Sequence, residues 1–271
     1  MSKKFALKLV AVLLMFLLFI SCGSNDRKRQ KGNLNVSENV DSTAANNPQQ
    51  SKNVKASPRI NVFIENSGSM TGYIQGNTEF KGALANILVE LKYLYTEDSI
   101  NLYFINEQTY PIKEEIEQFI TKLNNNFFGV GITGTSNLNN IFKQILEKTD
   151  KNSISILVSD CIYSVNGSQT TLECLNDEKN LTKIAFLEKS RSGVPLQTTV
   201  IQLSSTFNGR YYDNKDRPWQ MSNVKRPYYF CSIGSTELID DFNKKIDLKK
   251  LDGYQNIIIS SSKDFIKIAP S

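Results

Sequence analysis

Oxygen-bearing side chains gather at three points of the sequence in a pattern that suits a hard divalent cation. An acidic residue and two serines alternate along one loop, so their side chains can point to one side. A second loop offers a hydroxyl group, and a third offers another carboxylate. Mg²⁺ prefers six oxygens in a near-octahedral shell and usually keeps some water. These candidate ligands are Glu65, Ser67, Ser69, then Thr135 or Ser136, and Asp160. Together they leave at least one position of the cation's shell open, which a carboxylate of a protein partner can fill.

Each of these loops follows or precedes a segment with a regular apolar pattern. Apolar runs at 60–64 and 154–158 predict strands that end at Glu65 and just before Asp160. Helical spacing of apolar residues at 80–95 and 138–146 predicts helices between them. Alternating strands and helices indicate an α/β, Rossmann-like fold, with a mostly parallel central sheet and helices on both faces. Such sheets place their sites at the carboxyl ends of the strands, where these loops fall.

The order of the three loops resembles a von Willebrand factor type A domain. The run Val-Phe-Ile-Glu-Asn-Ser-Gly-Ser-Met at 62–70 is the most specific part, followed by Gly-Thr-Ser-Asn-Leu at 134–138 and by Asp160 after an apolar strand. The resemblance covers roughly residues 59–246. It implies a metal-ion-dependent adhesion site that binds a protein partner through a divalent cation, with Mg²⁺ favoured and Ca²⁺ or Mn²⁺ as alternatives.

The sequence departs from the family pattern at the site itself. Glu65 stands where the family has Asp, and its longer side chain can bind a cation directly, bind through water, or not bind at all. Thr135 and Ser136 both fit the second-loop position. The site therefore has a second interpretation, in which the loops keep their shape without a metal: residues 67–69 form a helix-entry turn, and Asp160 is a cap or a hydrogen-bond acceptor.

A further departure lies between the strands expected at 199–203 and 228–233. The family has a helix there, whereas residues 206–226 show no helical period and contain Asn208-Gly209, a hairpin signal. The sequence predicts a hairpin or flap whose aromatic residues either form a partner surface or cover the sheet edge. These aromatic residues are Tyr211, Tyr212 and Trp219.

The composition excludes several catalytic classes. The chain of 271 residues has no histidine, which removes Ser-His-Asp and Cys-His catalysis and ordinary zinc ligation. Neither a phosphate-binding glycine loop nor a nucleophile elbow is present, so we expect a binding protein rather than an enzyme. Cysteines at 161, 174 and 231 form no CxxC pair and suggest no disulfide framework, although a bridge between 161 and 174 remains open.

The N-terminal residues predict export and lipid anchoring. Residues 1–21 combine a basic start with an apolar run and end in Ser-Cys, like a bacterial lipoprotein signal, so cleavage and lipidation are expected at Cys22. Residues 22–57 are polar and aperiodic and predict a disordered tether to a domain at 58–271. Three of the charges in the net +5 lie in the signal, so the mature chain is near neutral and nucleic acid is not an expected partner.

These features predict a lipid-anchored module in the bacterial cell envelope, in the outer rather than the inner membrane, facing the periplasm or the surface. Its function is expected to be metal-dependent recognition of a protein partner that presents an acidic residue. The alternative is a metal-independent structural component of an envelope complex.

Overall fold

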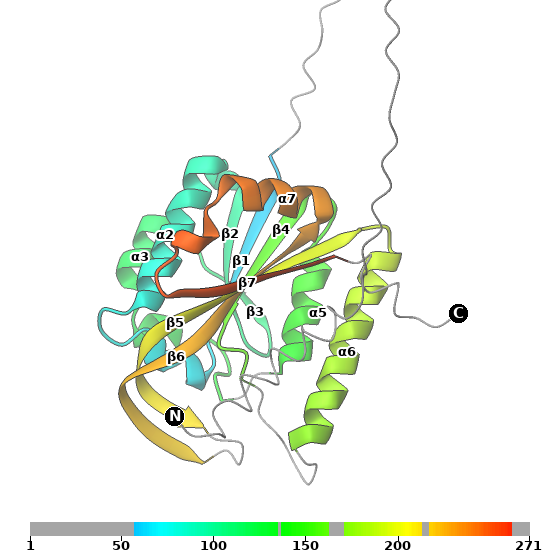
Figure 1. Cartoon of the computed structure of the whole chain (residues 1–271). Coiled ribbons are helices and arrows are strands. Elements are labelled where there is room, and N and C mark those ends of the chain that lie inside the picture. Colours follow the sequence, from blue (N-terminus) through cyan, green and yellow to red (C-terminus); the bar gives the residue numbers. More distant parts are fainter. Residues whose placement is uncertain (1–56, 135–136, 163–170, 213–216, 262–271) are drawn as a thin grey trace, which may run out of the picture.

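The computed structural model describes residues 57–134, 137–162, 171–212 and 217–261, with the side chains of 171, 172 and 212 excluded. Within these residues the chain forms one seven-stranded mixed sheet with the order β3-β2-β1-β4-β6-β5-β7 (Figure 1). The strands are β1 (Arg59–Glu65), β2 (Ile100–Ile105), β3 (Thr109–Pro111), β4 (Ser153–Ser159), β5 (Leu196–Tyr212), β6 (Pro218–Ser235) and β7 (Tyr254–Ser261).

Helices connect the strands and cover the sheet. The α-helices are α2 (Glu79–Leu94), α3 (Ile116–Lys122), α4 (Asn125–Phe128), α5 (Leu138–Lys148), α6 (Thr171–Arg191) and α7 (Thr236–Lys245). Short 3₁₀ helices are η1 (Gly68–Tyr73), η2 (Glu97–Ser99) and η3 (Leu248–Lys250). No helix among the described residues has the length and apolar character needed to cross a membrane.

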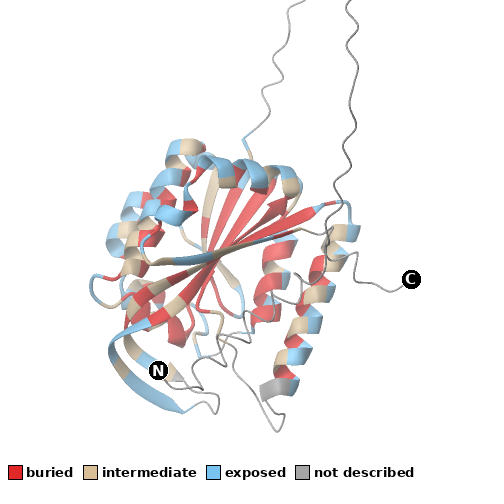
Figure 2. Cartoon of the chain, viewed as in Figure 1, coloured by how far each residue is buried: buried red, intermediate tan, exposed pale blue. Residues whose placement is uncertain are grey.

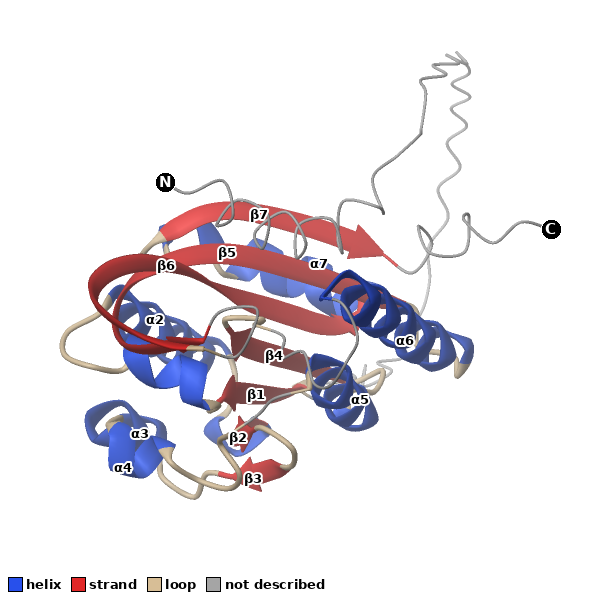
Figure 3. Ribbon diagram, turned by 90° about the horizontal axis from the view of Figure 1, so that it is seen from below, coloured by secondary structure: helices blue, strands red, loops and turns tan. Residues whose placement is uncertain are grey.

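The two central strands are buried on both faces. Every residue of β4 is buried, and so is all of β1 except Arg59, which gives the red centre of the sheet in Figure 2. Alternate residues of β1 point in opposite directions: Val62 packs in a core with α2, α3 and α7, whereas Phe63 packs in a second core with α5 and α6. Helices therefore cover both faces of the sheet (Figure 3), which confirms the α/β class.

The expectation of a mostly parallel sheet holds for only part of it. β1 pairs in parallel with β2 and β4, but the pairings of β3, β6, β5 and β7 are all antiparallel. The physical reason is the connection between β5 and β6. A helical crossover allows parallel neighbours, whereas these two strands are joined directly at 213–217 and must run in opposite directions.

The β5–β6 pairing extends into the segment 206–226, where the sequence predicted a hairpin or flap. The pairing runs from Leu196 opposite Ser235 to Tyr212 opposite Pro218. Asn208-Gly209 does not form the turn that its sequence suggested, since β5 continues past it to Tyr212. The register shifts between Phe207 and Gly209 instead, as at a β-bulge. The bulge lies where the hairpin crosses η1.

Local capping residues begin the helices that follow the site loops. The Thr78 hydroxyl accepts a hydrogen bond from the Lys81 backbone N–H at 3.4 Å and starts α2. The Asn137 side chain accepts one from the Asn140 N–H at 2.8 Å and starts α5. Both are caps that satisfy a donor of the first helical turn.

Candidate functional site

The candidate site lies at the carboxyl ends of the parallel strands. β1 ends at Glu65 and β4 ends at Ser159, and the two strands are adjacent, with Ile64 opposite Val158. The chain after β1 enters η1, and the chain after β4 continues to Asp160. The sheet register therefore brings Glu65 and Asp160 to the same edge, as the sequence predicted from the strand ends.

A buried hydrogen-bond network surrounds Glu65, whose residue is 0% exposed. Its Oε1 accepts a hydrogen bond from the Ser67 hydroxyl at 2.7 Å, and its Oε2 accepts a short one from the Ser159 hydroxyl. The Ser67 and Ser69 hydroxyl oxygens lie 3.1 Å apart. Hydroxyl donors replace the hydrogen bonds to water that a carboxylate loses when it is buried. We call Glu65, Ser67, Ser69, Ser159 and Asp160 the Glu65 cluster.

Asp160 is held at this edge by its backbone and its side chain. Its residue is buried, its Oδ1 accepts a hydrogen bond from the Ile162 N–H at 3.2 Å, and its own N–H points to the Met70 sulfur at 3.2 Å. The negative charge acts on the η1 segment: burial, and then Asp160, raise the pKa of the Tyr73 hydroxyl well above its usual value. Asp160 thus adds a second carboxylate beside the loop that carries the serines.

The turn after Asp160 has an unusual backbone. Cys161 has a φ of 50°, in the left-handed region that only a few per cent of non-glycine residues adopt. Its N–H donates to the Ser159 hydroxyl at 2.8 Å, so Ser159 connects this turn to Glu65. Contact with the thiol of Cys231, followed by burial, raises the pKa of the Cys161 thiol. Among the described residues, no disulfide joins the cysteines at 161, 174 and 231, so the bridge between 161 and 174 that the sequence left open is not present.

Two asparagines that the sequence analysis did not select support the first loop. Asn66 donates its side-chain amide to the carbonyls of Phe128 and Val130 at 2.8 and 2.7 Å. Asn106 donates to the Asn66 side-chain oxygen at 3.0 Å and to Val130 at 2.9 Å. Both follow directly after a parallel strand, β1 or β2, and that shared position was the signal in the sequence.

These contacts bring the second loop beside the first. The Gly68 N–H donates to the carbonyl of Thr133 at 2.8 Å, so residue 133 lies against the loop that carries Ser67 and Ser69. The candidate ligands Thr135 and Ser136 lie outside the described residues, as does Cys22. On their far side, Asn137 caps α5 and donates to Glu178 at 3.3 Å. Of the residues on either side of 135–136, Thr133 thus lies against the first loop, and Asn137 begins α5.

The aromatic residues of the hairpin differ in their surroundings. Trp219 is 54% exposed, with the Arg217 guanidinium 6.0 Å from its ring centre. Tyr211 pairs across the hairpin with Trp219, but its ring lies half-buried under the Arg226 guanidinium, 4.1 Å away. The side chain of Tyr212 is outside the description. Trp219 is therefore largely exposed, whereas Tyr211 mainly packs within the hairpin.

The Glu65 cluster offers the type of donor atom that a hard cation prefers. All donors of the Glu65 cluster are oxygens, and a serine that donates its proton to Glu65 keeps lone pairs that can face a cation. The charge is modest: the described residues contain no group of three acidic, cysteine or histidine side chains that could hold a metal. Proteins nevertheless commonly bind Mg²⁺ through one or two carboxylates, and Glu65 and Asp160 supply two.

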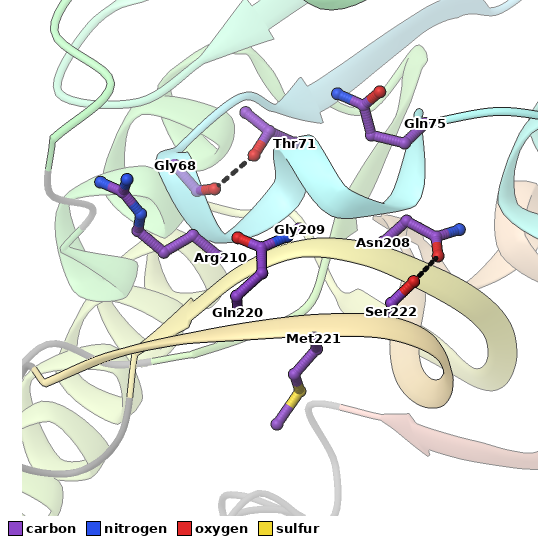
Figure 4. Close-up of a pocket in the computed structure, with 9 residues that line it drawn as sticks. All are labelled: Gly68, Thr71, Gln75, Asn208, Gly209, Arg210, Gln220, Met221 and Ser222. Carbon is purple, nitrogen blue, oxygen red and sulfur yellow. Dashed lines mark hydrogen bonds between the residues drawn. The ribbon is translucent and has the colours of Figure 1, made fainter.

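A cleft of about 510 Å³ opens beside the cluster, between η1 and the hairpin (Figure 4). Its floor includes Gly68, which stands between Ser67 and Ser69 in the chain, so a ligand in the cleft lies next to the serine loop. The two walls touch at Gly72 and Gly209, where a Cβ on Gly209 would lie 2.7 Å from the Gly72 Cα. The other lining residues are Thr71, Gln75, Asn208, Arg210, Gln220, Met221 and Ser222.

Comparison with known proteins adds no relative to this description. No protein-family model matches the chain, and neither does any curated protein.

Proposed function

We propose that the chain is a binding module of the von Willebrand factor A type that recognises a protein partner with the help of a divalent cation at the Glu65 cluster. The observation that supports it most is the hydrogen-bond network that joins Glu65 to the hydroxyls of Ser67 and Ser159, with Asp160 directly after the adjacent strand end. The adjoining cleft gives a partner segment room beside that edge. The proposal includes the Rossmann-like fold of that family.

The network suggests how the Glu65 departure is accommodated. Glu65 accepts protons from Ser67 and Ser159, so it orients hydroxyls rather than having to serve as a ligand itself. Ser67, Ser69 and Asp160 would hold the cation, with Mg²⁺ favoured over Ca²⁺ or Mn²⁺, and Thr135 or Ser136 would complete the set. A carboxylate that orients a ligand from behind is a common second layer of metal sites. The bound cation would supply a positive centre for an acidic residue of the partner.

The proposal includes a membrane anchor for this module. In the proposal, lipid on Cys22 anchors the chain in the cell envelope, in the outer membrane rather than the inner, and residues 23–57 let the domain reach its partner. The role is recognition rather than catalysis.

The test is a thermal melt of the purified full-length chain in EDTA and in Mg²⁺, Mn²⁺ and Ca²⁺. A cation at a hundredfold excess over its dissociation constant stabilises the folded state by about 2.7 kcal/mol, which for a domain of this size raises the melting temperature by about 5–10 °C. The rise should disappear in Asp160→Asn and persist in Asp98→Asn, an exposed aspartate of η2. Equal melting temperatures in metal and in EDTA would contradict the cation site.

A metal-independent structural role is the second candidate. It is favoured by the modest acidic content of the cluster and by the exposed Trp219 on the hairpin. It predicts that association with the partner survives EDTA and Asp160→Asn but fails in Trp219→Ala. Association that fails in EDTA and survives Trp219→Ala would exclude it.

A further inference from the structure

Two cysteines lie together beside the turn that follows Asp160. Cys231 of β6 is 2% exposed and belongs to the core that α5 and α6 cover, and the half-buried Cys161 packs against the same core. The thiol of Cys161 is in hydrogen-bonding contact with the thiol of Cys231. Both are free thiols. One sulfur atom of the pair is therefore partly open to solvent, and the second lies enclosed behind it.

The strand pairing explains why the two thiols meet. Cys231 lies opposite Leu157 in the antiparallel β4–β6 ladder, and alternate residues of a strand share a face, so Ser159 points to the same face as Cys231. The chain then turns at Cys161, which has a φ of 50°, and the Cys161 N–H donates back to the Ser159 hydroxyl at 2.8 Å. Tyr229, opposite Ser159, responds to both sulfur atoms: burial, then Cys161 and Cys231, raise the pKa of its hydroxyl. The turn thus folds over the face that carries Cys231.

Two other roles of paired cysteines lack the residues that they need. A structural zinc site takes four cysteine or histidine ligands, whereas the described residues contain no group of three acidic, cysteine or histidine side chains that could hold a metal. A cysteine nucleophile is commonly activated by an adjacent histidine base, and the chain has no histidine. Two thiols in contact can still be oxidised to a disulfide, which needs no further side chain.

We propose that Cys161 and Cys231 form an oxidation site that a small organic disulfide, such as oxidised glutathione, converts into an intrachain disulfide bond. The Cys161 thiolate attacks the disulfide of the donor, so that a mixed disulfide forms and one donor thiolate leaves. The Cys231 thiolate then attacks the Cys161 sulfur and displaces the second donor thiolate. The two protons lost by the cysteines end on the two donor sulfurs, so the donor gains the two electrons that the pair loses.

The order of the two steps follows from burial. Cys161 is half-buried and meets the donor first, whereas Cys231 is enclosed and reacts from within the protein. The resulting bond joins the turn after Asp160 to β6. The bond requires no cation, so this site goes beyond the proposed function and does not depend on it.

The test is a disulfide map of the purified full-length chain after equilibration with oxidised and reduced glutathione. EDTA is present so that trace metals do not catalyse oxidation by air. Free thiols are blocked with N-ethylmaleimide, and tryptic peptides are identified by mass spectrometry without reduction. Cys161 and Cys174 fall in one tryptic peptide, because no lysine or arginine lies between them, so Cys174→Ser is the matched control that assigns the link. We expect Cys161 to be joined to Cys231 in the wild-type chain and in Cys174→Ser.

A variant of the enclosed cysteine separates the two steps of the reaction. In Cys231→Ser the reaction should stop at the mixed disulfide between Cys161 and glutathione. The map of the wild-type chain stands whether or not this variant folds. A mixed disulfide that persists on Cys161 in the wild-type chain, a Cys161 that does not react, or a link from Cys161 to Cys174 would overturn the assignment.

Thermal melting shows whether the bond belongs to the folded protein. The link closes a loop of about 70 residues, so the linked chain should melt about 5–15 °C higher than the same chain after treatment with dithiothreitol. A linked chain that melts lower than the reduced chain would show that the bond forms in unfolded molecules, and that result would also overturn the site.

Discussion

Ser159→Ala tests whether the Glu65 network is what holds the site together. The substitution removes one oxygen from the end of β4, and that oxygen makes two contacts. It donates the short hydrogen bond to Glu65 Oε2 and accepts the Cys161 N–H at 2.8 Å. The residue is 0% exposed, so no bulk solvent replaces either contact directly.

The expected loss follows from the type of bond. A hydrogen bond to a charged group contributes about 1.5–3 kcal/mol, and a buried group that loses its partner adds to that. We therefore expect Ser159→Ala to lower the free energy of unfolding by about 2–3 kcal/mol. With a urea dependence of about 2–3 kcal/mol per molar for a domain of this size, the urea midpoint falls by about 1 M.

The assay is urea unfolding followed by circular dichroism, in EDTA so that no cation contributes. Ser192→Ala is the matched control, because its exposed hydroxyl donates to the Lys189 carbonyl at 2.7 Å at the end of α6. That surface change should alter stability by no more than about 0.5 kcal/mol.

A double-mutant cycle decides whether the effect passes through Glu65. Ser159→Ala is measured in the wild-type chain and in Glu65→Gln, and the difference gives the coupling energy, which for residues in direct contact is about 0.5–3 kcal/mol. A coupling near zero, or a loss no greater than that of Ser192→Ala, would refute the view that Ser159 stabilises the buried carboxylate.

Three further predictions concern the framework of the site. Asn66→Ala removes the two hydrogen bonds to the carbonyls of Phe128 and Val130, so chemical denaturation should show a loss of about 2–4 kcal/mol; a loss below about 1 kcal/mol would mean that the first loop does not depend on this residue. Gly209→Ala forces a methyl group against the Gly72 backbone, so calorimetry should show destabilisation of about 1–3 kcal/mol; Gly134→Ala, where a Cβ meets no neighbouring atom, is the control, and an equal loss in both variants would contradict the contact. Glu79 pairs with Lys225, whose hydrogen bond lowers the pKa of Glu79 from 4.5 to about 2; the pair is partly exposed, so we expect it to stabilise the fold by about 1 kcal/mol. A carboxylate with a lowered pKa stabilises above its unfolded pKa, so the advantage of wild type over Glu79→Gln should be complete at pH 7 and vanish between pH 4.5 and 2; a constant difference across that range would contradict it.

The roles of Glu65 and Arg226 are complementary in charge. Glu65 is a buried anion satisfied by hydroxyl groups, and Arg226 is a buried cation held by aromatic rings. η1 lies between the strand ends and the hairpin, and its Tyr73 lies near charges of both signs: burial and then Asp160 raise the pKa of the Tyr73 hydroxyl, whereas Arg226 lowers it.

Local chemistry in the sequence was sufficient to predict the α/β class and the loops of the site. Apolar runs at 60–64 and 154–158 specified the two central strands, because strands buried on both faces need continuous apolar residues. Asn77 and Thr78 were both residue types that can cap a helix, and the structure uses the Thr78 hydroxyl at the start of α2. The positions of Glu65 and Asp160 at strand ends were enough to predict that they share one edge of the sheet.

Only the tertiary structure decided how these parts meet. The antiparallel half of the sheet follows from the pairing of β6 between β4 and β5, a long-range choice that periodicity does not record. Asn208-Gly209 has the composition of a turn, but contact with Gly72 places it in a bulge instead. Ser159 and Arg226 resemble any strand residue in the sequence, and their importance arises because folding buries one against a carboxylate and the other between two aromatic rings.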